Sequence, residues 1–548
     1  MRRRDFLRSS AYGGAVALAM PSAALAVAED DRAAGLSPFD LEELTIIDLQ
    51  REMVSGRKTA RSITQQYISR IAELDRRGPE LRHVLEINPA AIAIAESLDA
   101  ERRRRGPRGP LHGIPLLLKD NVDTADGMTT TAGSYALEGS IAERDAFIAG
   151  RLRQAGAILL GKTNMSEWAN FRSTHSSSGW SGRGGQGRNP YVLDRNPCGS
   201  SSGSGAGVSA NYCAAAIGTE TDGSIVCPAS ANAIVGLKPT LGLVSRSGII
   251  PIAHSQDTAG PMTRTVADAA ILLGALAGAD PLDSATKNAR SRGAPDYTRF
   301  LDVNGLRGAR IGVARAKFFG YSDAADALVN EAINVMGRRG AVIVDPADIP
   351  NAGQYGDTEF EVLLYEFKAD LNSYLASLGP KAPVKSLAQV IQFNERNKDR
   401  EMPWFGQELL LMAEKKGGLT SSKYRAALAK NRRLSRTEGI DAVMRRHRLD
   451  AIVAPTGSPP WPTDLVNGDH FTGGSSTPAA VAGYPNITVP AGFTRGLPVG
   501  VSFIGRAWSE PVLIRLAYAF EQVTRHRRPP RFVPTMVTAA GSLPNPEG

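Results

Sequence analysis

Two stretches near the start of the chain repeat apolar residues at the spacing of one helix face. Between residues 40 and 55 and between residues 60 and 75, these residues recur every three or four positions, which predicts two amphipathic helices. Short apolar runs typical of buried strands follow at residues 114–119, 157–160 and 214–217. They alternate with helical segments such as residues 145–155. Because strands that alternate with helices form a sheet with helices packed on it, the pattern predicts an α/β fold.

The pattern changes in the remainder of the chain. Residues 161–207 are rich in Gly, Ser and Asn and too polar for a core element, and loops of this length are usually functional or disordered. Residues 325–446 have a mostly helical pattern, which predicts an insertion or lid over the sheet. Strand patterns return at residues 451–454, 487–489 and 499–504, before a last helix at 510–524. We expect these late strands to complete the same sheet.

The amino terminus has the pattern of an export signal. Arg3 and Arg4 form a twin-arginine pair, and the apolar stretch at residues 11–20 is followed by small residues. A membrane anchor is the alternative, but this run is shorter than the roughly 18 residues of a spanning helix and contains two glycines. The sequence therefore predicts a twin-arginine signal peptide at residues 1–28. We expect export to the periplasm or the medium, with no stable membrane association after cleavage.

Composition and charge argue against a nucleic-acid partner. With 42% hydrophobic and 6% aromatic residues, the chain has a globular composition rather than that of a disordered protein or a coiled coil. The formal net charge of +9 falls to +6 when the four arginines and the one aspartate of residues 1–28 are set aside. Apart from residues 102–105, the basic residues are mixed with acidic ones, and that run is typical of a solvated helix end. We therefore expect no nucleic-acid binding.

The cysteines and histidines do not suggest a metal site. Cys198, Cys213 and Cys227 form no CxxC pair, and their odd number predicts neither a disulfide framework nor a zinc ribbon. The seven histidines are dispersed, and no HExxH motif occurs. We expect no metal and no cofactor.

Two glycine-containing motifs suggest other chemistries that their context argues against. Residues 156–163 match the phosphate-binding pattern GxxxxGK[ST], but residues 157–160 are an apolar run typical of a buried strand. Residues 199–203 match the nucleophile elbow GxSxG of α/β-hydrolases, which would make Ser201 the nucleophile. That elbow must follow a strand directly, whereas residues 194–198 have the composition of a turn. Neither a nucleotide-binding protein nor an α/β-hydrolase is favoured.

Three other segments carry residue types suited to nucleophilic catalysis. Lys119 ends an apolar strand, where loss of hydration favours a neutral amine that can act as a base, although such a lysine can also simply pack its stem on the core. Residues 197–205 place Ser200 in a hydroxyl-rich, glycine-rich segment that resembles a linker but leads directly into an apolar stretch. Ser224 lies in a turn beyond a buried strand. Its neighbouring N–H groups could form an oxyanion hole, or the turn could be an ordinary one.

Together these segments resemble the amidase signature family. Further motifs of the family occur at residues 161–167, 236–240, 256–262 and 496–500. The similarity extends over residues 37–532, identified as an amidase domain with a helical insertion at about 325–446, and leaves a C-terminal tail at residues 533–548. It implies a single large α/β domain in which helices cover both faces of a central mixed β-sheet.

The resemblance also implies the roles of the site residues. Ser224 falls on the nucleophile position of the family, Ser200 on the proton relay that follows a cis peptide bond, and Lys119 on the base. The oxyanion hole would be formed by Thr221, Asp222, Gly223 and Ser224. Within the family the chain is most similar to bacterial peptide amidases, which implies release of ammonia from C-terminal peptide amides through an acyl-enzyme.

The chain departs from the commoner family pattern at four positions. Cys198 and Ser202 stand where glycines are usual, Asp222 replaces a glycine, and Val226 replaces an arginine. A carboxylate beside an oxyanion would oppose its charge, so we expect the side chain of Asp222 to point away while its N–H donates. The peptide amidases look similar at these positions, so the departures indicate a substrate class rather than lost activity.

Several alternatives remain open from the sequence. Amidases of the same family that act on aryl, aliphatic or cyclic amides share the catalytic core. The subunit that makes glutaminyl-tRNA shares it too, but would be cytoplasmic, which the export signal argues against. An exported binding protein without catalysis is a further alternative, which labelling of Ser224 by a fluorophosphonate would distinguish. The expected partner is a small-molecule or peptide amide, and the expected state is a monomer or homodimer.

Overall fold

The computed structural model describes residues 38–536 of the 548-residue chain. The predicted signal peptide at residues 1–28 lies outside the described residues, as does most of the tail predicted at residues 533–548. The described residues belong to one compact unit. Among them, no helix combines the length and the apolar character that crossing a membrane requires.

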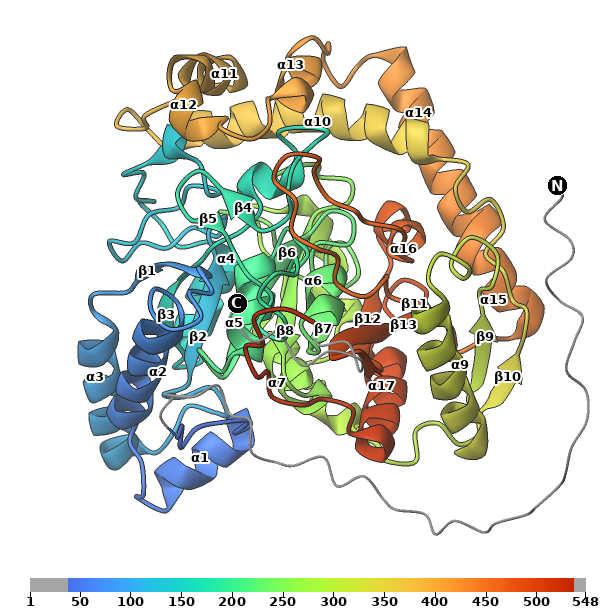
Figure 1. The fold of residues 1–548 in the computed structure, drawn as a ribbon, viewed down its shortest axis with the longest axis horizontal. Coiled ribbons are helices and arrows are strands. Elements are labelled where there is room, and N and C mark those ends of the chain that lie inside the picture. The colour runs from blue at the N-terminus through green and yellow to red at the C-terminus, as the bar shows by residue number, and fades with distance from the viewer. Residues whose placement is uncertain (1–37, 537–548) are drawn as a thin grey trace, which may run out of the picture. The chain divides into compact units, whose positions relative to one another are not determined.

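A mixed sheet of eleven strands runs through this unit (Figure 1). Its strands follow the order β1-β3-β2-β6-β8-β7-β12-β13-β11-β9-β10. They span Val84–Ile87 (β1), Pro115–Lys119 (β2), Ile158–Thr163 (β3), Ala215–Glu220 (β6), Val235–Lys238 (β7), Thr258–Thr263 (β8), Arg310–Val313 (β9), Val342–Val344 (β10), Ala451–Pro455 (β11), Asn486–Thr494 (β12) and Leu497–Ile504 (β13). A separate two-stranded sheet pairs β4 (Trp180–Ser181) with β5 (Gly185–Gln186). The predicted central mixed sheet is confirmed.

The parallel strands of this sheet bring two functional segments to one edge. β2 lies parallel to β3 on one side and to β6 on the other, with Leu118 opposite Ile217. Parallel neighbours end at the same edge of a sheet. Lys119, the last residue of β2, and Glu220, the last residue of β6, are therefore brought to the same edge.

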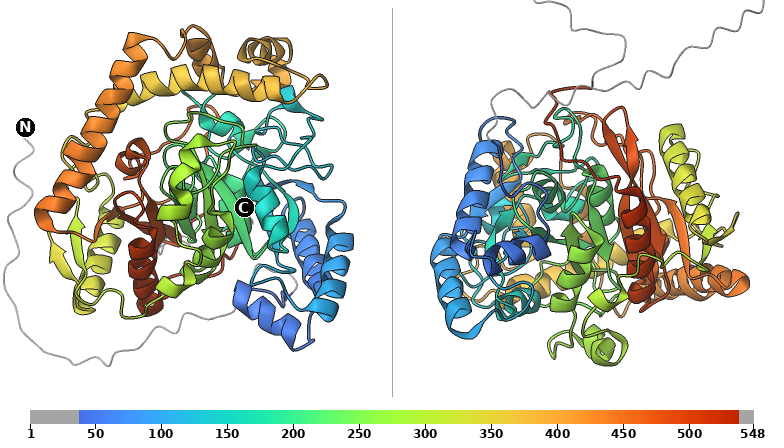
Figure 2. Two further views of the ribbon diagram at one scale, coloured as in Figure 1. Left: turned by 180° about the vertical axis from the view of Figure 1, so that it is seen from behind. Right: turned by 90° about the horizontal axis from the view of Figure 1, so that it is seen from below.

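Helices cover both faces of the sheet, as the sequence predicted. α5 and α6 pack on one face, against β6 and β13, while α7 and α17 contact β8 and β12 on the other (Figures 1 and 2). The α-helices are Ile46–Val54 (α1), Ala60–Leu74 (α2), Ala91–Arg105 (α3), Phe147–Gln154 (α4), Ser202–Ser209 (α5), Val226–Ala231 (α6), Val266–Leu276 (α7), Ala289–Arg292 (α8), Asp323–Arg338 (α9), Gly356–Ser377 (α10), Leu387–Arg396 (α11), Lys398–Glu401 (α12), Glu408–Glu414 (α13), Ser422–Arg432 (α14), Asp441–His447 (α15), Thr477–Ala482 (α16) and Glu510–Thr524 (α17). Shorter helical segments are Tyr135–Leu137, Glu167–Asn170, Ser284–Asn288, Thr298–Phe300 and the π-helical Arg433–Ile440.

The segment at residues 325–446 is mostly helical, and its helices α10 to α14 form an arc beside the sheet (Figure 1). Apolar residues of α10, α11 and α13 meet others from residues 132–171 in a hydrophobic cluster separate from the sheet. The segment also contains the short strand β10, which extends the sheet parallel to β9. The sequence pattern did not indicate this strand, which has only three residues.

Candidate active site

Lys119 is fully buried at the end of β2. Its Nζ lies 2.8 Å from Ser200 Oγ, 2.9 Å from Thr219 Oγ1 and 3.3 Å from the carbonyl oxygen of Thr219. The amide of Asn121 also donates to Thr219 Oγ1, at 3.0 Å. Lys119 and Ser200 were predicted from the sequence, whereas Thr219 was not. Its only signal in the sequence was its place in the segment that carries Ser224.

The environment of Lys119 favours a neutral amine. Burial lowers the pKa of Lys119 to about 7, and the carboxyl groups of Asp257 and Glu220 offset this effect only in part. A neutral amine has two N–H donors and one lone pair, which matches the three contacts around Nζ. Two N–H groups can donate to Thr219 while the lone pair accepts the hydroxyl proton of Ser200. Lys119 can therefore act as a base near neutral pH.

Ser200 lies buried in the turn that precedes α5. The peptide bond between Gly199 and Ser200 is cis. Gly199 packs so closely on Ser166 that a Cβ at this position would collide with the Ser166 side chain. The N–H of Ser166 also donates to the carbonyl oxygen of Ser200, at 3.1 Å. These contacts hold the segment so that the Ser200 hydroxyl meets Lys119.

Ser224 lies in the turn between β6 and α6 and is 9% exposed. The buried carboxyl group of Glu220 accepts the N–H groups of Ile225 and of the following residue, at 2.8 and 3.0 Å, and so closes the turn. The carbonyl oxygen of Ser224 accepts the N–H of Ser201, at 3.2 Å. The turn that carries Ser224 is therefore bonded directly to the segment that carries Ser200.

The same turn presents backbone donors. Gly223 has a φ of +79°, a conformation that favours glycine. Within the described part of the chain, the N–H groups of Asp222, Gly223 and Ser224 donate to no protein acceptor. The carboxyl group of Asp222 is engaged elsewhere, accepting the hydroxyl of Ser476 at 2.5 Å. Three free N–H groups next to a serine can stabilise a negatively charged oxygen.

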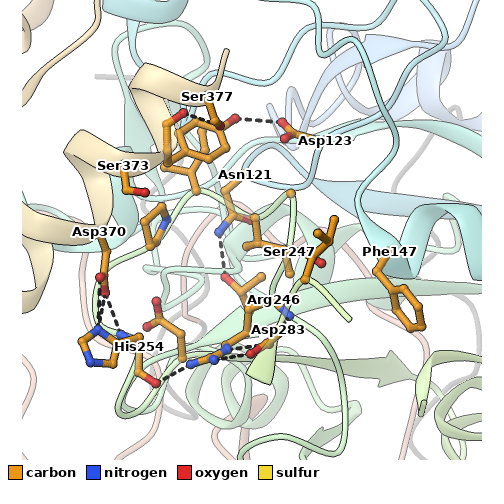
Figure 3. Close-up of a pocket in the computed structure, with 18 of the residues that line it drawn as sticks. Asn121, Asp123, Phe147, Arg246, Ser247, His254, Asp283, Asp370, Ser373 and Ser377 are labelled. Atoms are coloured by element: carbon orange, nitrogen blue, oxygen red, sulfur yellow. Dashed lines mark hydrogen bonds and ion pairs between the residues drawn. The ribbon is translucent and has the colours of Figure 1, made fainter. Parts of the chain in front are cut away.

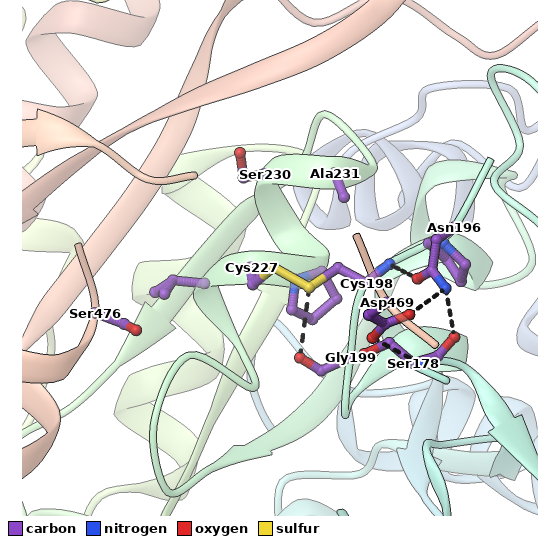
Figure 4. Close-up of a disulfide and its surroundings, with 12 residues drawn as sticks. Ser178, Asn196, Cys198, Gly199, Cys227, Ser230, Ala231, Asp469 and Ser476 are labelled. Carbon is purple, nitrogen blue, oxygen red and sulfur yellow. Dashed lines mark hydrogen bonds between the residues drawn. A yellow bond between two sulfur atoms is a disulfide. The ribbon is translucent and has the colours of Figure 1, made fainter. Parts of the chain in front are cut away.

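A disulfide joins Cys198 to Cys227, with Cα atoms 6.0 Å apart (Figure 4). The sequence predicted no disulfide framework, because the number of cysteines is odd and no CxxC pair occurs. The third cysteine, Cys213, is free and buried, so an odd number is compatible with one bridge. Cys198 precedes Ser200 by two residues and Cys227 follows Ser224 by three. The bridge therefore ties together the two segments that carry the serines.

A cavity of about 670 Å³ lies beside Thr219 and Asn121, the polar neighbours of Lys119 (Figure 3). Charged side chains on its wall pair with one another, as His254 does with Asp370. Neither of the two serines lines this cavity. The cavity therefore lies next to the neighbours of Lys119. It does not include Ser224, on which an acyl group would form.

At the edge of this cavity, His254, Glu366 and Asp370 lie close enough for their ligand atoms to share a metal ion, all within 4.8 Å of one another. Both ring nitrogens of His254 already face carboxylates, with Nδ1 2.8 Å from Asp370 and Nε2 3.4 Å from Glu366. The hydrogen bond that His254 donates to Asp370 raises the pKa of His254, and a protonated imidazole has no lone pair for a metal. These residues fit an ion-pair network better than a metal site.

Comparisons with known proteins agree on one family. A model of the family described as Amidase matches residues 62–514. The chain is 45% identical to a probable amidase of Arabidopsis thaliana, over 91% of this chain and 93% of that protein. It is 35% identical to a subunit of the glutamyl-tRNA(Gln) amidotransferase from Myxococcus xanthus, over 88% of this chain and 98% of that protein. Among solved structures it is similar to the native peptide amidase of Stenotrophomonas maltophilia, with 53% identity, a TM-score of 0.87 and coverage of 90% of this chain and 100% of that one.

Proposed function

We propose, from the premise that the chain belongs to the amidase family and is a hydrolase of amides, that it releases ammonia from C-terminal peptide amides through an acyl-enzyme on Ser224. The observation that carries the proposal is the buried contact of 2.8 Å between Lys119 Nζ and Ser200 Oγ. It places a neutral base behind a hydroxyl that can both accept and donate a proton.

The proposed reaction begins with two proton transfers. As the hydroxyl of Ser224 gives its proton to Ser200, Ser200 gives its own to Lys119, and Ser224 Oγ attacks the amide carbon. The N–H groups of Asp222, Gly223 and Ser224 stabilise the oxyanion that forms. The carbon–nitrogen bond then breaks as Ser200 protonates the leaving nitrogen and recovers a proton from the lysine.

The second half of the reaction reverses this path. Water attacks the ester on Ser224 and gives its proton to Ser200, which passes a proton to Lys119. The tetrahedral intermediate collapses to the free acid as Ser224 takes back its proton. The same relay therefore serves as acid and base in turn, which requires a lysine whose pKa lies near the working pH. The pKa of about 7 for Lys119 meets this requirement.

The substrate class is proposed from similarity. The likeness to a solved peptide amidase extends over 90% of this chain at 53% identity. It favours peptide amides over the aryl, aliphatic or cyclic amides that remain the alternative for this family. The direct test incubates the mature protein and its Ser224→Ala variant with a short blocked peptide amide, and follows ammonia release and formation of the free acid by mass spectrometry.

We expect the wild type to convert the peptide amide and Ser224→Ala to lose at least roughly 100-fold to 1,000-fold in rate. Hydrolysis of simple aryl or aliphatic amides alone would keep the amidase and overturn the peptide assignment. If no amide is hydrolysed and a fluorophosphonate does not label Ser224, the proposed mechanism is wrong.

Export through the twin-arginine route is also a proposal. The disulfide between Cys198 and Cys227 supports it, because such bonds persist mainly in oxidising compartments. Replacement of Arg3 and Arg4 by lysine should leave the protein in the cytoplasm, as measured by cell fractionation. Unchanged export of this variant would contradict the proposal.

A further inference from the structure

Two residues of the loop between β7 and β8 hold Thr221, which directly precedes Asp222 and the other free N–H groups of the site. Gln256 Nε2 donates to the carbonyl oxygen of Thr221 at 3.3 Å. The neighbouring carboxyl group of Asp257 accepts the hydroxyl of Thr221 at 2.6 Å. Gln256 is only 2% exposed, so water offers its amide little competition. Thr221 is therefore held through both its backbone and its side chain.

The contact with Gln256 also determines where the next N–H points. In a trans peptide the carbonyl and the N–H point in opposite directions. Because the carbonyl of Thr221 faces Gln256, the N–H of Asp222 faces the other way. Among the described residues this N–H has no acceptor, as expected of a donor reserved for a ligand. Gln256 thus fixes the plane of one proposed oxyanion donor.

Gln256 is itself held by the helical insertion. Its Nε2 donates to Glu359 Oε1 at 3.0 Å, and Glu359 lies in the first turn of α10, 7% exposed. The carboxyl group of Glu359 also lies beside that of Asp222, near enough for the two to interact. Two carboxyl groups can bond to each other only when one of them carries a proton. Asp222, Glu359 and Gln256 therefore form one connected network behind the turn.

The surroundings of the two carboxyl groups keep that proton in place. Burial and the neighbouring charge of Asp222 hold the pKa of Glu359 well above its usual range, and burial raises the pKa of Asp222 as well. The groups that face the pair are Lys238 of β7, Glu220 of β6, Tyr355 before α10, and the hydroxyls of Ser476 and Thr477 at the start of α16. Only Lys238 among these favours ionisation through its charge.

We propose that Gln256 and Glu359 are positioning residues for amide hydrolysis, with Gln256 orienting the N–H of Asp222 and the singly protonated Asp222–Glu359 pair holding Gln256. This inference rests on the proposed function of the site. It gives the helical insertion a part in catalysis, since α10 supplies Glu359. It also explains how a carboxyl group is tolerated at position 222, because the shared proton leaves one negative charge on the pair instead of two.

Loss of the shared proton should impair the reaction. A second negative charge would break the hydrogen bond between Asp222 and Glu359, and it would oppose the developing oxyanion. The turnover number kcat of the wild type should therefore rise through the pKa of Lys119 and fall again at alkaline pH. In Glu359→Gln the amide can accept from Gln256 and donate to Asp222 without titrating, so the alkaline decline should disappear.

The experiment measures kcat and KM from pH 6 to pH 10.5 for the wild type, Glu359→Gln, Gln256→Met and a control. Gln256→Met keeps the length of the side chain but removes the donor, and we expect kcat to fall roughly 10-fold to 100-fold with KM within about 2-fold. Glu361→Gln, on the same helix but paired with Lys416 and Lys423, makes the same substitution away from the Asp222–Glu359 pair. This control should keep the alkaline decline of the wild type.

The outcomes separate this inference from the proposed function. An alkaline decline that persists unchanged in Glu359→Gln, or an unchanged kcat in a folded Gln256→Met, overturns the positioning roles while the amidase stands. If wild type neither hydrolyses amides nor reacts with a fluorophosphonate at Ser224, the proposed function fails first. Should Gln256→Met not fold, as judged by circular dichroism and thermal unfolding, the pH profile of Glu359→Gln decides the question.

Discussion

Replacement of Lys119 by methionine separates the chemistry of this residue from its effect on folding. Methionine has a similar length and volume but carries no amine, so the packing at the end of β2 is kept. The buried hydroxyl of Ser200 then loses its partner, and the relay has no base. We expect the variant to fold and to lose at least roughly 1,000-fold in kcat/KM.

The effect on stability depends on pH in a direction that the structure determines. The pKa of a lysine in the unfolded chain is 10.5, and burial lowers that of Lys119 to about 7. Between these values the unfolded state binds one more proton than the folded state, so the free energy of unfolding rises with pH. From pH 7 to pH 9 the wild type should gain about 2 kcal/mol relative to Lys119→Met, which lacks the titrating amine.

Thermal unfolding provides the assay. For a chain of about 500 residues the entropy of unfolding is about 1 kcal/mol/K, so about 2 kcal/mol corresponds to about 2 °C in Tm. The Tm of Lys119→Met minus that of the wild type should therefore decrease by about this amount from pH 7 to pH 9. Lys415→Met, at an exposed position of the surface, serves as the matched control and should show no such trend.

Kinetics give a second, independent reading of the same pKa. The kcat/KM of the wild type should rise about tenfold per pH unit below the pKa of Lys119 and then level off, before the decline expected at alkaline pH. The two measurements must agree, because both report the protonation of the free enzyme. A Tm difference that stays constant from pH 7 to pH 9, or substantial activity in Lys119→Met, would refute the reasoning.

Three further predictions concern the serine segments. Ser200→Ala should lower kcat at least roughly 100-fold in a folded protein, because no hydroxyl then links the nucleophile to the amine; a variant that keeps its kcat would contradict the relay. Gly223→Ala should slow fluorophosphonate labelling of the nucleophile, since the residue has a φ of +79° and a Cβ would lie 3.0 Å from Ser476 Oγ; an unchanged labelling rate would argue against this turn as the oxyanion site. Reduction of the bridge between Cys198 and Cys227 should lower the stability by up to about 3 to 4 kcal/mol, measured by urea unfolding with and without dithiothreitol, and an unchanged midpoint would show that the bridge does not stabilise the fold.

Elements with strong local patterns were predicted closely. The last helix was expected at residues 510–524 and is observed as Glu510–Thr524. The strand expected at residues 157–160 is observed as Ile158–Thr163, because Lys162 finds the carbonyl of Val122 and the hydroxyl of Thr130 inside the protein. An apolar run marks a buried strand, but it does not show how far the strand continues through polar residues that find partners.

Strands without such a pattern were not predicted. β8 lies between β6 and β7 in the middle of the sheet, yet it contains Pro261, which pairs with Ile217. A proline within a run argues against a central strand, since it cannot donate to the ladder. The tertiary arrangement overrides this local preference. β10, with three residues, is too short to give any periodic signal.

The residues of the candidate site likewise fall into those that the sequence predicted and those that it did not. Lys119, Ser200 and Ser224 could be selected because each stands in a distinctive local segment, and the structure brings their segments together. Gln256 and Glu359 are 103 residues apart. Gln256 opens the family motif at residues 256–262, but that motif indicated no role for it, and Glu359 lies in no motif. Their relation to the site depends on α10 reaching the turn after β6, which is a property of the tertiary fold. The disulfide was missed for a similar reason, because cysteine number alone does not give spatial proximity.

Two buried lysines have different parts in the charge balance of this region. Lys238 lies on β7, and the carboxyl groups of Glu220, Glu510 and Asp222 raise its pKa against the effect of burial, leaving it at about 8. It is therefore the cation that offsets the acidic groups behind the turn. Lys119 receives weaker support and has a pKa of about 7. Lys238 supplies a positive charge that offsets the negative charge of these carboxyl groups. Lys119 can therefore lose its proton although acidic groups lie nearby, and the site retains a neutral base.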